Sequence, residues 1–264
     1  MLRTDWERLL QGSTFNSFNI FNLIAGAMLG ADVNMDLDDA YREWLRFGLV
    51  SPLEYDSCPQ EPCVPKAPQA FDVFKRLMKD SWKILEKTLY VRGHVFNRNA
   101  QMFDRYFLTY FIMTVQHTRD HWDAGASEKV QPVGDHMEIM FREKQEARQM
   151  AADLRNWLKP EALGVSADIE KYLNFVLDVY EVYVEIFDAQ IRTAAWIRKA
   201  EQSCSAEDRR SAGETLAEYD GLADRLAAVV SGRGYSNNVE YVMDPERIRR
   251  FKEDCSRTLD ELGG

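Results

Sequence analysis

The chain has 264 residues, 45% of them hydrophobic and 29% charged, which is typical of globular proteins and excludes a disordered or collagen-like chain. Its 33 Lys and Arg residues and 43 Asp and Glu residues give a formal net charge of −10. It therefore lacks the basic surface with which proteins bind nucleic acids or anionic membranes. With only 14 Gly and 8 Pro, we expect a mainly helical protein with no nucleic-acid partner.

Helical patterns begin in the first 50 residues. Thr4 and Glu7 form a capping box before a first helix. Two apolar stripes with helical spacing follow, over residues 18–29 and 37–45, and Gly48 ends the second. A pair of small residues four positions apart, Gly26 and Gly30, predicts a close contact with another helix. We expect a short helical segment over residues 1–50.

A proline-rich stretch separates this segment from the rest of the chain. Five of the eight prolines lie in it: Pro52, Pro59, Pro62, Pro65 and Pro68. Because proline lacks a backbone donor and clashes with the preceding helical turn, no helix continues through this spacing. We interpret residues 51–68 as a linker and residues 69–264 as a second domain.

Longer periodic segments fill the second domain. They cover 71–89 (ending before Gly93), 99–124 (apolar on nearly all sides), 135–158 (stopped by Pro160), 166–194, 212–226 and 244–259. In the last, Asp244 is the expected N-cap and Pro245 the first helical residue. No segment alternates with the period of a strand, apart from one short extended piece at 239–243. The fold class predicted is all-α: an antiparallel multi-helix bundle preceded by a shorter N-terminal helical segment.

Membrane and disulfide signals are weak. No stretch is apolar for the ~18 residues that a spanning helix needs, and the N-terminus lacks the basic region, apolar run and cleavage site of a secretory signal. Four cysteines, Cys58, Cys63, Cys204 and Cys255, are too few for a disulfide framework in a chain of this length. We expect a cytoplasmic protein with reduced cysteines and no membrane partner.

A metal site is the first chemical possibility, because His117 and His121 lie four residues apart on one face of a predicted helix. Two histidines at that spacing can bind a metal ion. The segment reads His-Thr-Arg-Asp-His, however, and lacks the glutamate of the zinc protease motif. Both histidines also continue an apolar stripe. We favour packing over metal binding and expect no cofactor.

The second possibility is the polar connection Arg92-Gly-His-Val-Phe-Asn-Arg-Asn99, which lies between two predicted helices. Loops held by rigid helices often carry binding groups, and arginine and histidine suit a carboxylate or sugar hydroxyl groups. Arg92, His94, Asn97 and Arg98 are therefore candidate ligand-binding residues. The alternative is a solvated turn in which Asn97 or Asn99 caps the next helix.

One predicted helix has a basic face, formed by Lys75, Lys79, Lys83 and Lys87 at intervals of four residues. A solvated helix face is the favoured interpretation. The alternative is contact with the acidic stretch 31–63, in which eight acidic residues are accompanied only by Arg42 and Arg46.

Several passages resemble one enzyme family. They are Asn16-Ser-Phe-Asn-Ile-Phe-Asn22, followed by Gly26 and Leu29; Asp32-Val-Asn-Met-Asp-Leu-Asp-Asp-Ala-Tyr-Arg-Glu-Trp44; Leu85-Glu-Lys-Thr-Leu-Tyr-Val-Arg-Gly-His94; and Arg142-Glu-Lys-Gln-Glu-Ala147. Together they are similar to the end of the barrel and the helical C-terminal region of (β/α)₈-barrel glycoside hydrolases related to alpha-glucuronidases. The resemblance implies that Asn16 and Asn19 line a sugar site, which Arg92 and His94 approach from the helical domain.

The catalytic barrel of that family is absent from this chain. Those enzymes hydrolyse with two carboxylates at the ends of earlier barrel strands, and the residues before the Asn-rich passage cannot form eight strands. The resemblance therefore implies a non-catalytic helical module that packs on a barrel or mediates dimerisation, with a carbohydrate as a possible ligand. The alternative function is a stand-alone helical protein-protein interaction protein without an active site.

Overall fold

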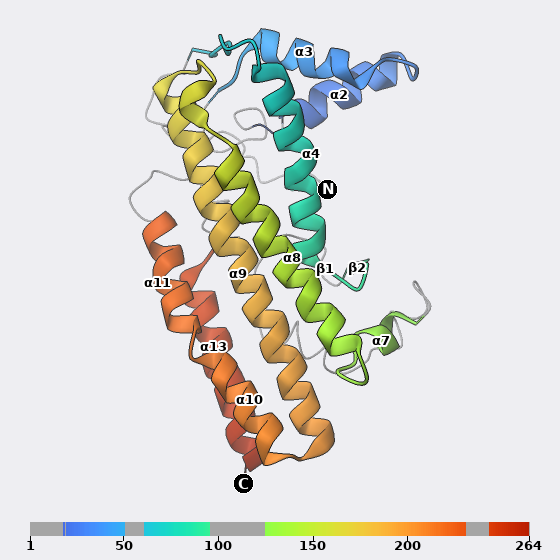
Figure 1. Cartoon of the computed structure of the whole chain (residues 1–264), viewed down its shortest axis with the longest axis vertical. Helices are drawn as coiled ribbons and strands as arrows, with labels where there is room; N and C mark the ends of the chain where they lie inside the picture. Colours follow the sequence, from blue (N-terminus) through green and yellow to red (C-terminus); the bar gives the residue numbers. More distant parts are fainter. Residues whose placement is uncertain (1–17, 19, 51–60, 96–124, 231–242, 264) are drawn as a thin grey trace, which may run out of the picture. The chain divides into compact units, whose positions relative to one another are not determined.

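The structure is a computed structural model that describes residues 18, 20–50, 61–95, 125–230 and 243–263. Its elements are α2 (Ile20–Ala31), α3 (Leu37–Phe47), α4 (Ala70–Leu89), β1 (Tyr90–Val91), β2 (His94–Val95), α7 (Ala126–Lys129), α8 (His136–Trp157), the 3₁₀-helix η3 (Pro160–Ala162), α9 (Ala167–Ser203), α10 (Ala206–Leu216), α11 (Tyr219–Val230) and α13 (Pro245–Gly263) (Figure 1). The predicted all-α class is confirmed. The capping box at Thr4, the helix over 99–124 and most of the extended piece at 239–243 lie outside the described residues.

Side-chain caps explain where several of these helices begin. The carboxylate of Asp36 accepts a hydrogen bond from the N–H of Asp38 at 2.9 Å before α3. Asp244 does the same for Glu246 at 2.9 Å before α13, and Ser205 accepts from two N–H groups at the start of α10. Each cap satisfies donors that have no partner inside the helix. The predicted start of α13 at Asp244 and Pro245 is confirmed.

The fold divides into two compact units, and the division falls within α4, α8 and α9. Unit 1 comprises residues 1–81, 154–178 and 230–241, and unit 2 comprises residues 82–153, 179–229 and 242–264. The predicted linker at 51–68 stays a prediction, because residues 51–60 are not described.

Unit 1 is built around a cluster of aromatic rings. Trp44 of α3 is 1% exposed and Phe74 of α4 is fully buried. Phe18 packs edge-on against Trp44 and Phe74, with ring centroids 5.7 Å apart in both pairs, and against Tyr172 of α9 at 5.0 Å. Edge-on packing places the positive rim of one ring on the negative face of the next. The apolar stripes predicted over 18–29 and 37–45 supply this core.

After α3, the chain of unit 1 turns at Gly48 and then forms a short antiparallel β-bridge between Leu49 and Cys63. Gly48 ends α3 with a φ of 92°, and a β-carbon there would lie 2.7 Å from the β-carbon of Pro62. Leu49 and Cys63 then exchange two backbone hydrogen bonds of 2.8 Å. Only glycine combines this backbone conformation with so close an approach.

The other predicted glycine contact is wrong. Gly26 and Gly30 are exposed on α2, and a β-carbon at either position would meet no atom within 4 Å. The apolar side of α2 that faces the core carries Phe21 and Ala25 instead.

Unit 2 is a bundle of antiparallel neighbours, as cross-helix pairs show. Lys87 of α4 pairs with Glu146 of α8 at 2.5 Å, and Arg148 of α8 with Asp188 of α9 at 2.9 Å. Further along the chain, α10 and α11 run back beside α9, and α13 runs back beside both. From Glu185 to Thr193 on α9 the partner's number falls from 225 to 215, and from Arg249 to Leu262 on α13 it falls from 224 to 209, as antiparallel packing requires.

One predicted helix is two helices in the structure. The stripe over 212–226 suggested a single element, but α10 ends at Leu216 and α11 starts at Tyr219. The N–H of Ala217 binds the carbonyl of Glu214 at 3.3 Å, three residues back, which tightens the last turn of α10. Both helices pack along α9. For this reason the apolar residues keep their helical spacing in the sequence although the helix is interrupted between Leu216 and Tyr219.

Candidate functional site

The polar connection predicted at 92–99 starts with a small hairpin. Tyr90 pairs with Val95, and Val91 pairs with His94. The two turn residues have positive φ values, 55° for Arg92 and 80° for Gly93, as in the type I′ turns that join two-residue hairpins. Because a non-glycine residue rarely adopts this conformation, the surrounding contacts must hold Arg92 in place.

Helix α8 supplies those contacts. Glu143 accepts a hydrogen bond from the backbone N–H of Arg92 at 2.8 Å. The next residue, Lys144, donates from Nζ to the carbonyls of Lys87 at 2.6 Å and Thr88 at 3.0 Å, and to that of Tyr90. The carbonyls of Lys87 and Thr88 lie at the C-terminal end of α4, where helices leave acceptors without partners, and that of Tyr90 follows in β1. A cation is also favourable there, because the helix dipole is negative at that end.

Lys144 is 1% exposed, although it carries a titratable amine. Burial lowers its pKa from 10.5 to about 7, and the nearby Glu143 and Asp188 carboxylates oppose the shift. Three carbonyl acceptors match the three N–H bonds of an ammonium group, whereas a neutral amine has only two. The side chain therefore acts as an internal cap for α4.

The sequence-predicted ligand residues are only partly within the described chain. Arg92 is half-buried, and its guanidinium lies 3.5 Å from the carbonyl of Lys129. The backbone of His94 belongs to β2, and its side chain is not described. The remaining candidates lie outside the described residues: Asn16, Asn19, Asn97, Arg98, Asn99, His117 and His121.

A second polar cluster lies between α8 and α9. Asp188 is 4% exposed and pairs with Arg148 at 2.9 Å and Arg192 at 3.3 Å. Arg192 also pairs with Glu218 at 2.7 Å. Burial alone would lower the pKa of Arg192, but the two carboxylates outweigh it and raise that pKa. Each charge in this cluster has a partner of opposite sign, as buried charges require.

A chain of hydroxyl groups continues the polar interior toward α11. Tyr219 donates from its hydroxyl group to Thr193 at 3.0 Å, and Thr193 lies 2.7 Å from the hydroxyl of Thr215. Thr215 donates to the carbonyl of Ala212 at 2.7 Å, so Thr193 is the donor in the pair between the two threonines. Burial raises the pKa of Tyr219 well above 10. This chain of hydrogen bonds joins α9 to α10 and α11, and each of the three hydroxyl groups donates its hydrogen to the next acceptor.

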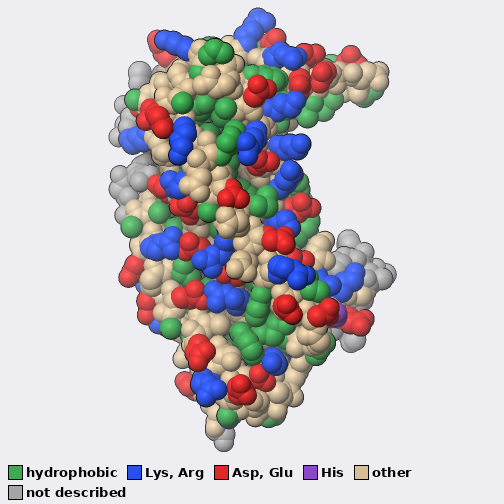
Figure 2. All heavy atoms as spheres, viewed as in Figure 1, with side chains coloured by type: hydrophobic (Ala, Val, Ile, Leu, Met, Phe, Trp, Pro, Cys, Tyr) green, Lys and Arg blue, Asp and Glu red, His purple; other side chains and the backbone are tan. Residues whose placement is uncertain are grey.

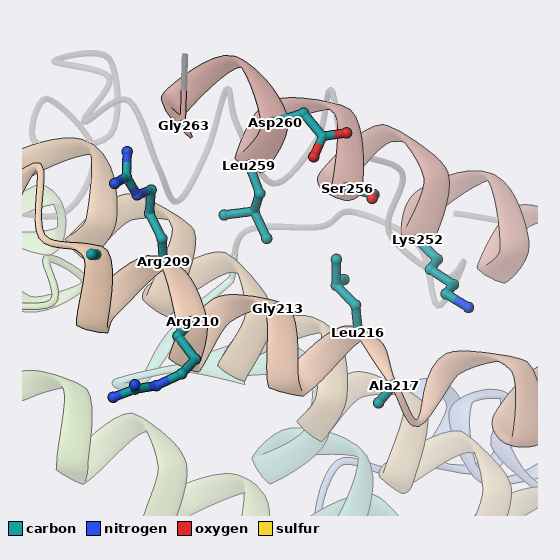
Figure 3. A pocket seen from close by; sticks show the side chains of 11 residues that line it. Arg209, Arg210, Gly213, Leu216, Ala217, Lys252, Ser256, Leu259, Asp260 and Gly263 are labelled. Atoms are coloured by element: carbon teal, nitrogen blue, oxygen red, sulfur yellow. The ribbon is translucent and has the colours of Figure 1, made fainter.

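A hollow of about 610 Å³ lies between α10 and α13 (Figure 3). Leu216 of α10 and Leu259 of α13 point into it. Its walls carry small residues that leave the groove open: Ala206, Gly213, Ala217, Ser256 and Gly263. A β-carbon on Gly213 would meet nothing within 4 Å.

This hollow continues along α13 into a second one of about 460 Å³, with which it shares Lys252, Ser256 and Asp260. The two are called the α10–α13 groove below. From Arg249 to Gly263 the groove follows α13 over 15 residues, a rise of about 21 Å along an α-helix. That length suits a helix of about four turns.

Charged residues flank the α10–α13 groove. Arg209 donates to the carbonyl of Leu262, and Lys252 pairs with Asp220. Arg210 is exposed on α10 and points away from α13 (Figure 3), and Asp260 is exposed on α13. Within the part of the chain that the structure describes, neither Arg210 nor Asp260 has a hydrogen-bond or ion-pair partner. These are the charges that an approaching protein could pair.

Two lysines of the predicted basic face of α4, Lys75 and Lys87, form ion pairs. Lys75 pairs with Asp38 of α3, so for this residue the alternative, contact with the acidic stretch, holds rather than the favoured purely solvated face. The hydrogen bond to Asp38 raises the pKa of Lys75. Lys87 instead pairs with Glu146 of α8. On the face of the molecule shown in Figure 2, basic and acidic side chains are interspersed.

Neither metal-binding nor membrane-spanning features occur in the described ranges. No group of three or more His, Cys, Asp or Glu side chains is placed to hold a metal ion among these residues. The helices described also do not combine the length and apolar character that a membrane-spanning helix needs.

Comparisons of the chain with protein-family models, curated proteins and solved structures found no match. The resemblance to the helical region of glycoside hydrolases therefore stays a prediction.

Sequence reasoning missed the α10–α13 groove, although a signal for it is present. Ala206 and Gly213 of α10 and its C-cap Ala217 recur at helical spacing, and Ser256 and Gly263 recur at an interval of seven on α13. Small residues in register on two neighbouring helices permit close approach of a third element. Which helices are neighbours, however, is known only from the tertiary structure.

Proposed function

We propose that this chain is a non-catalytic helical module that binds another protein through the α10–α13 groove. The proposal rests on one observation: the groove combines inward-pointing leucines and small-residue walls with unpaired charges on its rims, Arg210 and Asp260 among them. An apolar floor with a polar rim is the usual anatomy of a protein–protein interface. Helix-in-groove binding is a common use of such a surface.

The buried polar groups of unit 2 support a structural role for its interior. Lys144 is saturated by three carbonyls of α4 and β1, and Asp188 is held by two arginines. Groups fixed in this way set helix register. The exposed groove is the better candidate for a functional surface.

Site-specific photocrosslinking in cells tests the proposal. A benzophenone amino acid replaces Gly213, which lines the groove, or Gly221, an exposed glycine of α11 outside it; a β-carbon at either position meets nothing within 4 Å. We expect a discrete crosslinked protein from position 213 and none from position 221. Absence of any adduct specific to position 213 would contradict the proposal.

The predicted relationship to glycoside hydrolases supplies a second candidate function, in which the partner is a catalytic barrel. It is favoured by the passage from Asp32 to Trp44, which resembles the family. There, Asp36 caps α3 and Trp44 is buried beside Phe18 and Phe74. In this proposal Arg92 contacts an acidic sugar.

Two measurements test this second candidate. The DNA upstream of the coding sequence is expected to encode a barrel in the same reading frame or an adjacent one; unrelated flanking sequence would count against it. In the reassembled enzyme, Arg92→Ala is expected to weaken binding of an acidic sugar, because a guanidinium–carboxylate pair loses charge and hydrogen bonds together. Unchanged binding would remove Arg92 from the site.

A further inference from the structure

We propose that the occupant of the α10–α13 groove is a second copy of this chain, so that two grooves face each other in a symmetric four-helix dimer. This inference rests on the proposed function and names its partner. Three features of the groove carry it: the register of α10 on α13, the alternation of large and small residues, and the placement of the two unpaired charges.

The register comes from three contacts between antiparallel helices. Arg209 reaches the carbonyl of Leu262, Asp220 pairs with Lys252, and Asp224 pairs with Arg249 at 2.8 Å. Interpolation between these contacts gives the residues that lie at the same height on the two helices. Gly213 is level with Leu259, Leu216 with Ser256, and Arg210 with Asp260 to within one residue.

A two-fold axis parallel to the groove, between the two copies, keeps every residue at its height along the helices. It stacks α10 of one copy on α13 of the other. Each Leu259 then faces the partner's Gly213, and each Leu216 faces the partner's Ser256. Each of these two layers thus contains two leucines and two small residues, an alternation that lets facing helices interdigitate. In the same arrangement Arg210 of each copy meets the partner's Asp260, so both pairs form at once, as an isologous interface requires.

The charges also distinguish a second copy from other occupants. Beside Gly213 and Leu259, the groove carries an unpaired cation, Arg210, and an unpaired anion, Asp260, at nearly the same height on opposite rims. Glu253, further along α13, is another exposed acidic residue of the lining. A uniformly acidic or basic helix would satisfy only one of them. A second copy satisfies both.

The first test is the oligomeric state of the full chain, measured by sedimentation equilibrium. We expect a dimer at micromolar concentrations. Gly213→Phe, which fills the groove, is expected to be monomeric, whereas Gly221→Phe on α11 remains dimeric. Melting curves of both variants establish that they fold. The proposal is overturned if the wild-type chain stays monomeric even at about 100 times these micromolar concentrations. It is also overturned if the Gly213→Phe variant dimerises as the wild type does.

A charge exchange provides a sharper test. Arg210→Glu or Asp260→Arg alone places like charges opposite each other twice per dimer, and we expect each to weaken dimerisation by roughly tenfold or more. An equimolar mixture of the two variants forms a heterodimer with two pairs of opposite charge, so dimerisation is expected to return. Arg142→Glu, at an exposed position of α8 outside the groove, serves as the matched control. Failure of the mixture to associate better than either variant overturns the pairing.

The outcomes separate this inference from the proposed function. If position 213 crosslinks to a different protein and the chain is monomeric, the binding groove stands and the dimer fails. If position 213 crosslinks to nothing and the chain is monomeric, both proposals fail.

Discussion

The two units of this protein have different interiors. In unit 1, aromatic rings from distant parts of the sequence pack on one another, with Trp44 between Phe18, Phe21 and Phe74. Unit 2 holds every buried polar or charged side chain found among the described residues: Thr88, Lys144, Asp188, Gln190, Thr193, Asp208, Thr215 and Thr258.

This contrast separates two tasks of a protein interior. Ring packing buries a large apolar area and contributes stability, but it tolerates small shifts of one helix along another. Charge pairs and hydroxyl chains contribute less net stability, because removing them from water is costly. They do require particular partners, however, and so fix the register of α8, α9 and α10.

The largest effect is expected from truncation of the ring cluster. Trp44→Ala removes a side chain that is 1% exposed and is expected to cost about 4 kcal/mol in the free energy of unfolding, since large aromatic truncations leave a cavity. Urea denaturation measures the change. Phe47→Ala, at a 65% exposed position of the same helix, is the control and should change stability by less than about 0.5 kcal/mol. Similar losses at both positions would contradict the description of unit 1.

A smaller loss is expected when the charge cluster of unit 2 is opened. Asp188→Asn leaves Arg148 and Arg192 without their shared carboxylate, and we expect a cost of about 2 kcal/mol, below that of a fully buried pair because Arg148 is partly exposed. Glu185→Gln, on the same helix and paired with Arg225, is the control and should cost less. Equal melting temperatures for wild type and Asp188→Asn would show that the cluster adds no stability.

The buried lysine should make the stability of unit 2 depend on pH. The pKa of Lys144 is about 7 in the folded protein and takes its ordinary value of 10.5 in the unfolded chain. Between these two pH values the folded protein therefore binds fewer protons at this group than the unfolded chain does. Stability from this group therefore rises with pH above about 7, by up to about 1.4 kcal/mol per pH unit, and is constant below it.

Comparison with Lys144→Met isolates this dependence, because other titrating groups are common to both proteins. The free energy of unfolding is measured for each at pH 6, 7, 8 and 9. We expect the difference to move in favour of the wild type only above pH 7. A constant difference would mean that the three carbonyls keep the ammonium charged despite its burial.

The smallest effect concerns the hydroxyl chain. Thr193→Val keeps the shape of the side chain but breaks its bonds to Tyr219 and Thr215, and we expect a cost of about 1 kcal/mol. Tyr219→Phe removes the partner hydroxyl. Each single variant removes the hydrogen bond between Tyr219 and Thr193 and leaves one partner unpaired. The double variant removes both partners, so its loss of unfolding free energy should be less than the sum of the two single losses. Strict additivity would show that the hydroxyl groups are not coupled.

The amino-acid sequence by itself determined the helical class and several helix ends. Period-3.6 apolar stripes, Asp36 and Asp244 as caps, Pro245 at a first turn and Gly48 at a last turn all act over a few residues. For this reason they could be recognised without knowledge of the fold. The contact of Lys75 with the acidic stretch could be considered from the sequence as an alternative, since opposite charges on two predicted helices can form ion pairs.

Only the tertiary structure decided the rest. The apolar stripe over 212–226 is continuous in sequence, yet packing along α9 accommodates a break between α10 and α11. The cap that Lys144 places on α4 joins residues more than 50 positions apart, and the α10–α13 groove joins two helices that are separated in the sequence by the whole of α11. Local patterns set which side of a helix is apolar. Which helix that side meets depends on the free energy of the whole packed chain, so no short segment specifies it.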